Sequence, residues 1–340
     1  RKTFDLIINE ARRFALKEML PTYRDGDRIG VSYGNDGTVK VPECFHRVHK
    51  LYLAGEWTAP SADPEYGGQG MPRVIGFTTG ELFTGACLAF IMTPSLTHGA
   101  AHMFETFGSD EIRNLYVEKM YSGQWAGTMC LTEPQAGTHV GDVKTMATKE
   151  GDVYKITGTK IFISSGDHDL TENIIHPVLA RIEGDSPGSK GLSIFIVPKY
   201  WVNEDGSLGE FNDVVCTGIE EKMGSHGSAT CSMALGGKGK CRGMLLGKPG
   251  QGMMIMFHMM NEARLKVGFQ GFIQGSAAYQ YALAYARERR QGYDLDKGQK
   301  VGEEQVPIIR HPDVRRMLLW MKAHVEGMRS LNYYIARSFD

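Results

Sequence analysis

Two neighbouring segments decide the fold: residues 129–138, which read MCLTEPQAGT, and residues 158–166, which read GTKIFISSG. The first predicts a strand that ends at Thr132, followed by a Pro and Gly turn whose hydroxyls and backbone N–H groups suit a polar ring edge and a phosphate. The second predicts a strand that places Phe162 and Ser164 on one side, because alternate side chains share a face. Together the segments can form one wall of a site for a flat heteroaromatic cofactor, although strands of this composition are usually plain surface sheet.

The sequence around these segments is rich in Val, Ile, Thr and aromatic residues in short alternating runs. Turn residues separate the runs, and the turns at residues 150–152 and 157–159 are expected to close antiparallel hairpins. We therefore predict an all-β domain over residues 126–246, with strands at residues 127–131, 143–149, 153–157, 160–164, 174–182, 192–197 and 229–234.

On both sides of this β region, apolar residues recur at the three- and four-residue spacing of amphipathic helices. We predict helices at residues 4–20, 42–53, 71–107, 109–121, 253–290 and 306–339. The order lacks the strand–helix alternation of a Rossmann-type sheet and indicates an α+β multidomain protein. We expect the protein to have a helical domain over residues 1–125, then the β domain, and then a helical domain over residues 247–340. The last domain is expected to be incomplete, because no residue that ends a helix follows Ser338.

Composition limits the classes of function. The 340 residues are 42% hydrophobic and 23% charged, and their net charge is −1, which does not indicate nucleic acid as a partner. No apolar run reaches the roughly 18 residues of a membrane span, and the N-terminus does not resemble a signal peptide. The six cysteines include no C-x-x-C pair, so we expect reduced thiols and a cytoplasmic location.

Three other motifs are interpreted as structural. Residues 184–188 (GDSPG) match a nucleophile elbow on paper, but Pro187 has no N–H for an oxyanion hole. The acidic and histidine residues between Asp167 and His176 fit no standard metal spacing, so we expect no metal. Residues 247–252 (GKPGQG) lack the Walker lysine and serine and are interpreted as a linker into a helix.

Several segments taken together resemble the acyl-CoA dehydrogenase family, in order and spacing over nearly the whole chain. Residues 166–174 and the insertion at residues 200–212 further resemble the larger bacterial branch that includes methylthiopropionyl-CoA dehydrogenases. The segments that carry the family resemblance are 64–70 (PEYGGQG), 132–138 (TEPQAGT), 158–164 (GTKIFIS), 220–224 (EEKMG) and 287–292 (RERRQG).

The resemblance implies a middle antiparallel β-barrel-like domain between the two helical domains, with FAD lying between the β domain and the C-terminal helices. It implies that Met129, Leu131 and Thr132 meet the flavin, that Phe162 packs on the ring, and that Ser164 bonds near its polar edge. It also implies that Thr138 approaches the pyrophosphate. Arg289 and Gln291 match positions that reach the FAD of a neighbouring subunit, which implies a homodimer or homotetramer. The family often has Trp, Thr and Asp where this chain has Phe162, Ser164 and His139.

The implied reaction is α,β-dehydrogenation of an acyl-CoA thioester to the trans-2-enoyl-CoA, a step of fatty-acid β-oxidation, with electrons passed to an electron-transfer flavoprotein. Thr138, Asn261 and Arg264 are the implied substrate contacts. The general base is not found at the expected helix position, which is Ala263. Glu262 is the alternative candidate, but one helical step turns it by about 100° from that position.

We therefore expect the base to lie beyond Asp340 and this chain alone to be inactive. The sequence leaves three hypotheses for the function. The first is the dehydrogenase, the second is an acyl-CoA oxidase or related flavin monooxygenase, and the third is a catalytically inactive homologue that binds FAD or acyl-CoA.

Overall fold

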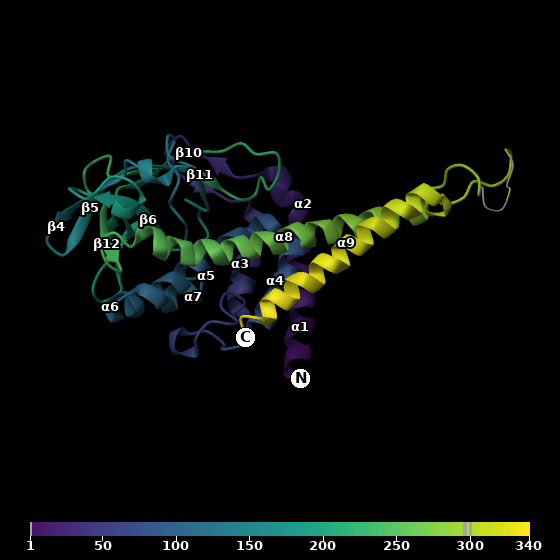
Figure 1. Cartoon of the computed structure of the whole chain (residues 1–340), viewed down its shortest axis with the longest axis horizontal. Helices are drawn as coiled ribbons and strands as arrows, with labels where there is room; N and C mark the ends of the chain where they lie inside the picture. The colour runs from purple at the N-terminus through teal and green to yellow at the C-terminus, as the bar shows by residue number, and fades with distance from the viewer. Residues whose placement is uncertain (1, 295–297, 299–300) are drawn as a thin grey trace.

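The protein, described here by a computed structural model, has three parts in chain order: N-terminal helices, a β region, and a long helical hairpin (Figure 1). The structure describes residues 2–294, 298 and 301–340. Within that part of the chain, every helix is too short or too polar to cross a membrane.

The N-terminal part begins with α1 (Lys2–Phe14), continues through a π-helical turn (Ala15–Met19) into α2 (Leu20–Ile29), and adds α3 (Glu43–Ala54). The predicted helix over residues 71–107 is divided into α4 (Arg73–Ala86) and α5 (Leu88–Phe107), because Cys87 between them is extended, with φ −157°. Two short helices, α6 (Asp110–Ile112) and α7 (Glu118–Tyr121), follow. The prediction missed a small hairpin of β1 (Ser32–Tyr33) and β2 (Val39–Lys40).

The β region contains one eight-stranded sheet, in which seven strands follow the order β10-β11-β5-β12-β7-β6-β3 and β4 pairs with both β5 and β6. A separate ribbon pairs β8 (Tyr200–Val202) with β9 (Leu208–Phe211). The sheet strands are β3 (Trp125–Gly127), β4 (Met146–Glu150), β5 (Val153–Ser164), β6 (Asn173–Ile182), β7 (Leu192–Pro198), β10 (Val214–Ile219), β11 (Thr230–Leu235) and β12 (Arg242–Leu246).

The sheet corrects the expectation that this domain is antiparallel throughout, because the pairs β3–β6 and β4–β6 are parallel. The path of the sheet ends at β10 and β3, while β4 bridges β5 and β6. The turn expected at residues 157–159 is also wrong, because these residues continue β5. Gly158 is needed there for a close approach rather than a turn: a Cβ at this position would lie 2.4 Å from Thr145 Oγ1.

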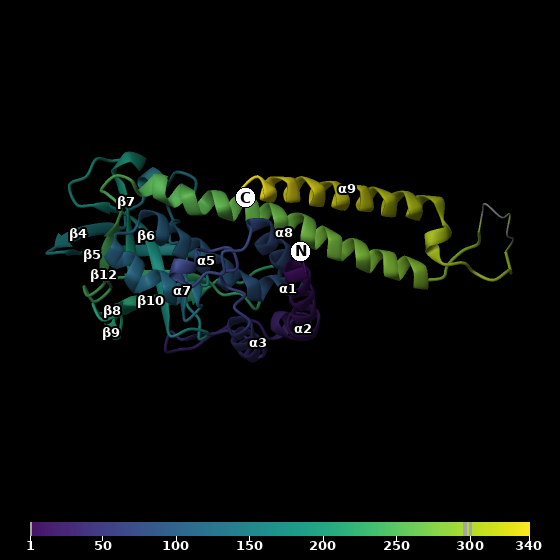
Figure 2. The same cartoon turned by 90° about the horizontal axis from the view of Figure 1, so that it is seen from below.

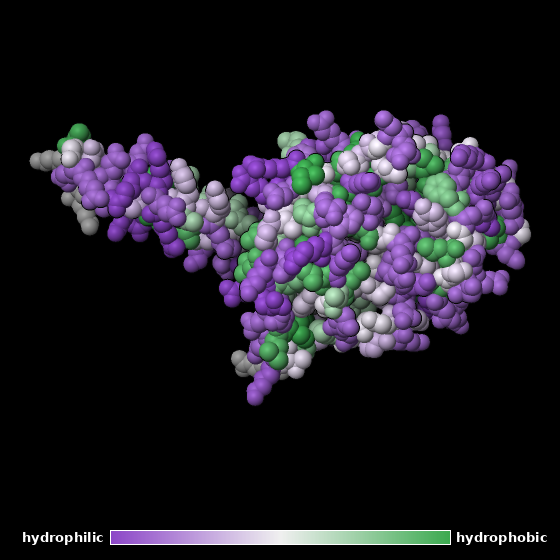
Figure 3. All heavy atoms as spheres, turned by 180° about the vertical axis from the view of Figure 1, so that it is seen from behind, coloured by the Kyte–Doolittle hydropathy of each residue, from purple (hydrophilic) through white to green (hydrophobic). Residues whose placement is uncertain are grey.

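The C-terminal part is a hairpin of α8 (Gly252–Glu288) and α9 (Pro312–Arg337), which project together away from the body (Figures 1 and 2). Seen from behind, the projecting end is mainly hydrophilic, and hydrophobic atoms are visible mostly over the body (Figure 3). The hairpin is held to α4 by Glu81, which accepts hydrogen bonds from Arg329 Nε at 3.0 Å and Tyr333 Oη at 2.7 Å.

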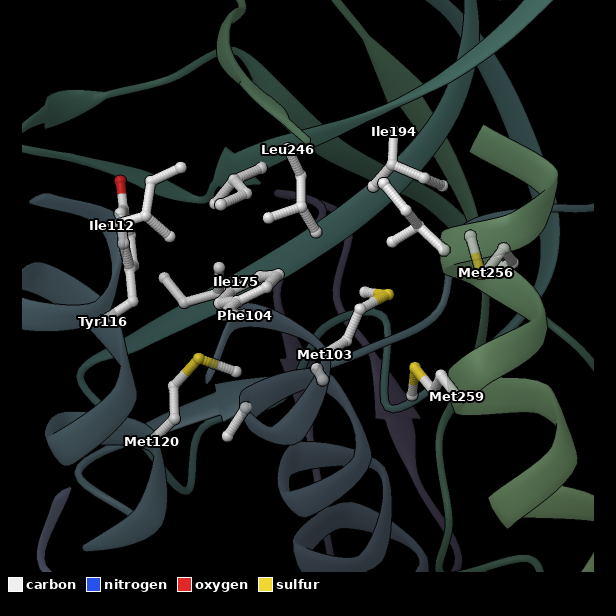
Figure 4. Packing of buried hydrophobic residues seen from close by; sticks show 14 of the residues in the cluster. Met103, Phe104, Ile112, Tyr116, Met120, Ile175, Ile194, Leu246, Met256 and Met259 are labelled. Atoms are coloured by element: carbon white, nitrogen blue, oxygen red, sulfur yellow. The ribbon is translucent and has the colours of Figure 1, made fainter. Parts of the chain in front are cut away.

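One hydrophobic cluster joins all three parts of the molecule (Figure 4). It contains Met103 and Phe104 of α5, Ile194 of β7, and Met256 and Met259 of α8, all fully buried or nearly so. Leu131 and Ala136, from the loop that follows β3, belong to the same cluster. The segment quoted first therefore shares one hydrophobic cluster with the start of α8.

Candidate functional site

The loop at residues 128–136 forms the first wall of the candidate site. Cys130 anchors it beside β6, because Cys130 N donates to Pro177 O at 3.0 Å and Leu179 N donates to Cys130 O at 3.0 Å. The loop then turns tightly, since Glu133 and Ala136 exchange backbone hydrogen bonds of 3.1 and 3.0 Å. Leu131 lies buried in the core, Met129 packs against it, and Thr132 is half-buried.

The end of β5 forms the second wall. Ile161 N donates to Thr132 O at 2.9 Å, so the two walls are neighbours. The pairing of β5 with β11 shifts in register here, and Phe162 adopts a left-handed backbone with φ 59° and exposes 59% of its surface. Lys160 and Ile163 are both buried although they are three residues apart, so the simple alternation used in the prediction is interrupted. The bulge is what turns the Phe162 ring outward.

A buried ion pair lies beneath both walls. Lys160 Nζ is 2.9 Å from Glu133 Oε1, and the exposed fractions of the two side chains are 0% and 2%. Burial alone raises the pKa of the Glu133 carboxyl, but the Lys160 cation and the N–H of Lys144 outweigh it and hold that pKa at about 2. Burial lowers the pKa of Lys160, and Glu133 opposes that shift. Sequence reasoning did not identify this pair; the signal was a lysine at an inward position of an otherwise apolar strand.

Thr138 and its neighbours lie at the exposed end of the first wall. His139, the residue at which the chain departs from the family pattern, has its Nε2 3.5 Å from Asp142 Oδ1, and both side chains are exposed. The carboxylate common at position 139 is thus replaced by an imidazole beside a nearby aspartate. The structure leaves Thr138 and its backbone accessible from solvent.

The start of α8 carries the predicted substrate residues. Met253 and Met260 pack against the hydrophobic cluster to which Leu131 of the first wall also belongs. Arg264 is exposed, donates to Asn261 Oδ1 at 3.0 Å, and has its guanidinium carbon 5.3 Å from the centre of the Phe257 ring. Arg264 and Asn261 are therefore together.

Glu262 points away from Arg264 and toward α5. Its carboxylate lies 2.8 Å from Lys266 Nζ, 3.4 Å from His102 Nδ1 and 3.7 Å from His98 Nε2. Burial by itself raises the pKa of Glu262, but Lys266 and the two histidines hold it well below its usual range. Burial, with help from Lys266, lowers the pKa of His98 to about 4. The spacing of His98 with His102 and of Glu262 with Lys266, each four residues apart, was the sequence signal for this cluster.

A cavity of about 500 Å³ adjoins this cluster between α4, α5 and α8. Phe77, Phe83 and Phe269 supply apolar surface, and Glu262 and Asn261 supply polar groups. None of the described residues 129–138 or 160–164 lines it. The cavity and the two walls therefore share no lining residues, although Asn261 of the predicted substrate contacts lines the cavity.

Arg289 and Gln291 lie at the far end of the hairpin, distant from the two walls of their own chain (Figure 1). Both are exposed. Their backbones are fixed by hydrogen bonds to the segment just before α9, from Ile308 N to Arg289 O at 2.8 Å and from Gln291 N to Val306 O at 3.0 Å. The structure does not bring them together with the other predicted cofactor residues within one chain.

Comparison with known proteins gives three family models that match along the chain. They are the acyl-CoA dehydrogenase N-terminal domain at residues 2–124, the middle domain at residues 128–236 and the C-terminal domain at residues 250–340.

Two curated relatives are 40% identical to the chain. A 3-methylmercaptopropionyl-CoA dehydrogenase of Ruegeria pomeroyi matches 95% of the chain and 54% of its own length. A butyryl-CoA dehydrogenase of Syntrophomonas wolfei matches 97% and 55%. The chain thus spans about half the length of these relatives.

Among solved structures, butyryl-CoA dehydrogenase from Megasphaera elsdenii superposes with a TM-score of 0.78 at 24% identity, and the match covers 99% of this chain and 79% of that one. At this level of identity the likeness concerns the fold: N-terminal helices, a middle β domain and C-terminal helices.

Proposed function

The chain belongs to the acyl-CoA dehydrogenase family, and from this premise we propose that it binds FAD between its β domain and α8 and takes part in the α,β-dehydrogenation of an acyl-CoA thioester. The observation that carries the proposal is the pair of adjacent walls, where an exposed aromatic ring in a strained backbone stands beside hydroxyl groups. In this role the enzyme passes electrons to an electron-transfer flavoprotein and works as a homo-oligomer.

The residues of the two walls fit a flavin. Phe162 exposes 59% of its surface from a left-handed backbone at the end of β5, so its ring is accessible for a flat ligand to pack on. Thr132, whose carbonyl accepts from Ile161 N, and Ser164, at the end of β5, both carry hydroxyls, and such groups can serve the polar edge of a heteroaromatic ring as donors or acceptors. FAD, when bound, supplies the hydride acceptor of the reaction.

The chain's own residues then have distinct roles. Met129, Leu131 and Thr132 contact the ring system, Thr138 approaches the phosphates, and Arg264 with Asn261 orients the thioester. Arg289 and Gln291 reach the cofactor of a neighbouring subunit.

Glu262 is poorly suited to remove the α-proton. Its carboxylate faces Lys266 and the histidines of α5 instead of Arg264, and its lowered pKa makes it a weak base. A general base works best when its pKa lies near the operating pH. We therefore assign Glu262 to the structure of the α5–α8 contact.

The test measures binding of FAD and of butyryl-CoA separately from turnover. The purified chain is titrated with FAD, followed by flavin fluorescence, and then with butyryl-CoA, followed by perturbation of the flavin absorption. We expect saturable FAD binding that Phe162→Ala weakens at least about tenfold, and a butyryl-CoA response that Arg264→Ala removes. Absence of saturable FAD binding by the unmodified chain, with its fold intact by circular dichroism, contradicts the proposal.

The rival oxidase function is separated by the electron acceptor. If the loaded protein is reduced by an acyl-CoA, slow reoxidation in air and fast reoxidation by an electron-transfer flavoprotein support the dehydrogenase. Fast reoxidation by oxygen alone supports the oxidase.

A further inference from the structure

The ammonium group of Lys160 is fully coordinated inside the protein. Its three N–H donors meet three oxygens: Leu179 O at 2.7 Å, Glu133 Oε1 at 2.9 Å and Leu131 O at 3.1 Å. These acceptors belong to β6 and to two positions of the first wall. A lysine on β5 therefore holds the loop at residues 131–133 against the sheet.

Glu133 completes the arrangement from the opposite side. Its Oε2 accepts from Lys144 N at 2.7 Å and from Gln135 Nε2 at 2.6 Å. Its Oε1 accepts from Thr145 N at 3.0 Å and from the Thr145 hydroxyl as well as from Lys160. The carboxylate thus ties the tight turn at residues 133–136 to the chain segment that leads into β4.

The position of this pair relates it to both walls. Glu133 immediately follows Thr132, and Lys160 lies two residues before Phe162. Lys160 also lies at the start of the register shift that gives Phe162 its left-handed backbone, since Met233 pairs with Lys160 and Cys231 pairs with Ile163. Anchoring the Lys160 side chain inward fixes the strand on one side of the bulge, while buried Ile163 fixes it on the other.

We propose that the buried Lys160–Glu133 pair is a clamp that positions both walls of the cofactor site, so that Leu131, Thr132 and Phe162 are held in place before the cofactor binds. Neither side chain touches the cofactor; both are positioning residues. The inference rests on the proposed function for the identity of the cofactor, but the preorganisation of the walls is a property of the cofactor-free chain.

Three variants test the clamp. Lys160→Met removes the cation and keeps most of the side-chain length, and Glu133→Gln removes the carboxylate charge with little change of shape. Asp213→Asn is the matched control: Asp213 is also a buried carboxylate that accepts two backbone hydrogen bonds, from Lys238 N at 2.7 Å and Lys240 N at 3.2 Å. Neither bond involves residues of the two walls.

Two readouts are required. Amide hydrogen exchange is measured on the FAD-free chain, and the FAD dissociation constant is measured by fluorescence titration. We expect both clamp variants to speed exchange at residues 131–136 and 161–163 at least about tenfold relative to the rest of the sheet, and to weaken FAD at least about tenfold. In Asp213→Asn, exchange at the two walls and FAD affinity stay within about twofold of the unmodified chain.

Several outcomes overturn the clamp. One is exchange at the two walls that is unchanged in both variants; another is exchange that rises uniformly over the sheet. Equal loss of FAD affinity in the control variant would also count against it. If Lys160→Met does not fold, the clamp is judged from Glu133→Gln and from the double variant Lys160→Met with Glu133→Gln. The double variant removes both charges, so neither is left buried and unpaired. If the unmodified chain binds no FAD, the proposed function fails, and the exchange data still judge the clamp.

Discussion

At the residue scale, the most informative position is Phe162. A non-glycine residue with positive φ costs free energy, and such strain is concentrated at functional sites. Here the strain coincides with exposure of an aromatic ring and with a shift in strand register. The sequence predicted Phe162 as a cofactor contact, but regular alternation was the wrong reason for its outward direction.

This strain gives a prediction for two substitutions at Phe162. Both Phe162→Ala and Phe162→Gly remove the ring, but only glycine adopts positive φ without a Cβ clash. We expect the glycine variant to be more stable than the alanine variant by about 1 kcal/mol in urea unfolding, although both lose FAD affinity. An alanine variant equal to or more stable than the glycine variant would show that the backbone is not strained.

A second residue-scale prediction concerns Lys266, whose ammonium group lies 2.8 Å from the largely buried carboxylate of Glu262. Removing this cation takes away the nearest partner of that carboxylate, so Lys266→Met is expected to lower the free energy of unfolding by about 3 kcal/mol. Arg13→Met, which breaks the exposed pair with Glu10, is the control and should leave the free energy of unfolding close to that of the unmodified chain. Equal effects of the two substitutions would refute the structural role given to Glu262.

At the element scale, long periodic helices were predicted well and β5 was not. The pattern of residues 253–290 predicted α8 to within a few residues of its ends. In contrast, the Thr157-Gly158-Thr159 segment has the composition of a turn, and its contacts with β4 and β11 in the sheet explain why it continues a strand. Such a contact joins distant parts of the chain, so a local pattern cannot reveal it. The Lys160–Glu133 pair was missed for the same reason.

The hairpin of α8 and α9 carries the element-scale prediction. Large apolar side chains are exposed along it, including Tyr281 at 80% and Trp320 at 61%. Exposed apolar surface of this kind favours association. We expect the chain to form dimers or larger species in sedimentation experiments, and we expect Tyr281→Asp with Trp320→Asp to shift it toward monomer. A chain that sediments as a monomer at high concentration contradicts the proposed oligomer.

At the scale of the whole molecule, buried histidines make stability depend on pH. Burial lowers the pKa of His49 and His98 from 6.5 to about 4, and of His168 and His176 to about 3. Between pH 6.5 and these lower values the unfolded chain binds protons that the folded chain does not. Their contribution to stability is therefore complete above pH 6.5 and is lost as the pH falls.

The prediction is a fall in the free energy of unfolding below pH 6.5, with each histidine contributing up to about 1.4 kcal/mol per pH unit. Glu133 adds a loss at lower pH, between its ordinary value of 4.5 and about 2. Urea unfolding at a series of pH values measures the slope. His176→Gln should reduce this slope by the contribution of one histidine. A stability that is flat from pH 6.5 to 4.5 contradicts this account.

The three-part architecture follows from the sequence because helical and strand periodicities are local, and the middle part departs from expectation where parallel pairing brings β3 and β4 beside β6. The central claim is that the loop after β3 and the bulged end of β5 together form the flavin site. A crystal structure of the chain grown with FAD tests it most directly. The account predicts the flavin ring against Phe162 with its polar edge at Leu131 and Thr132. A flavin bound elsewhere, with these two walls open to solvent, would contradict it.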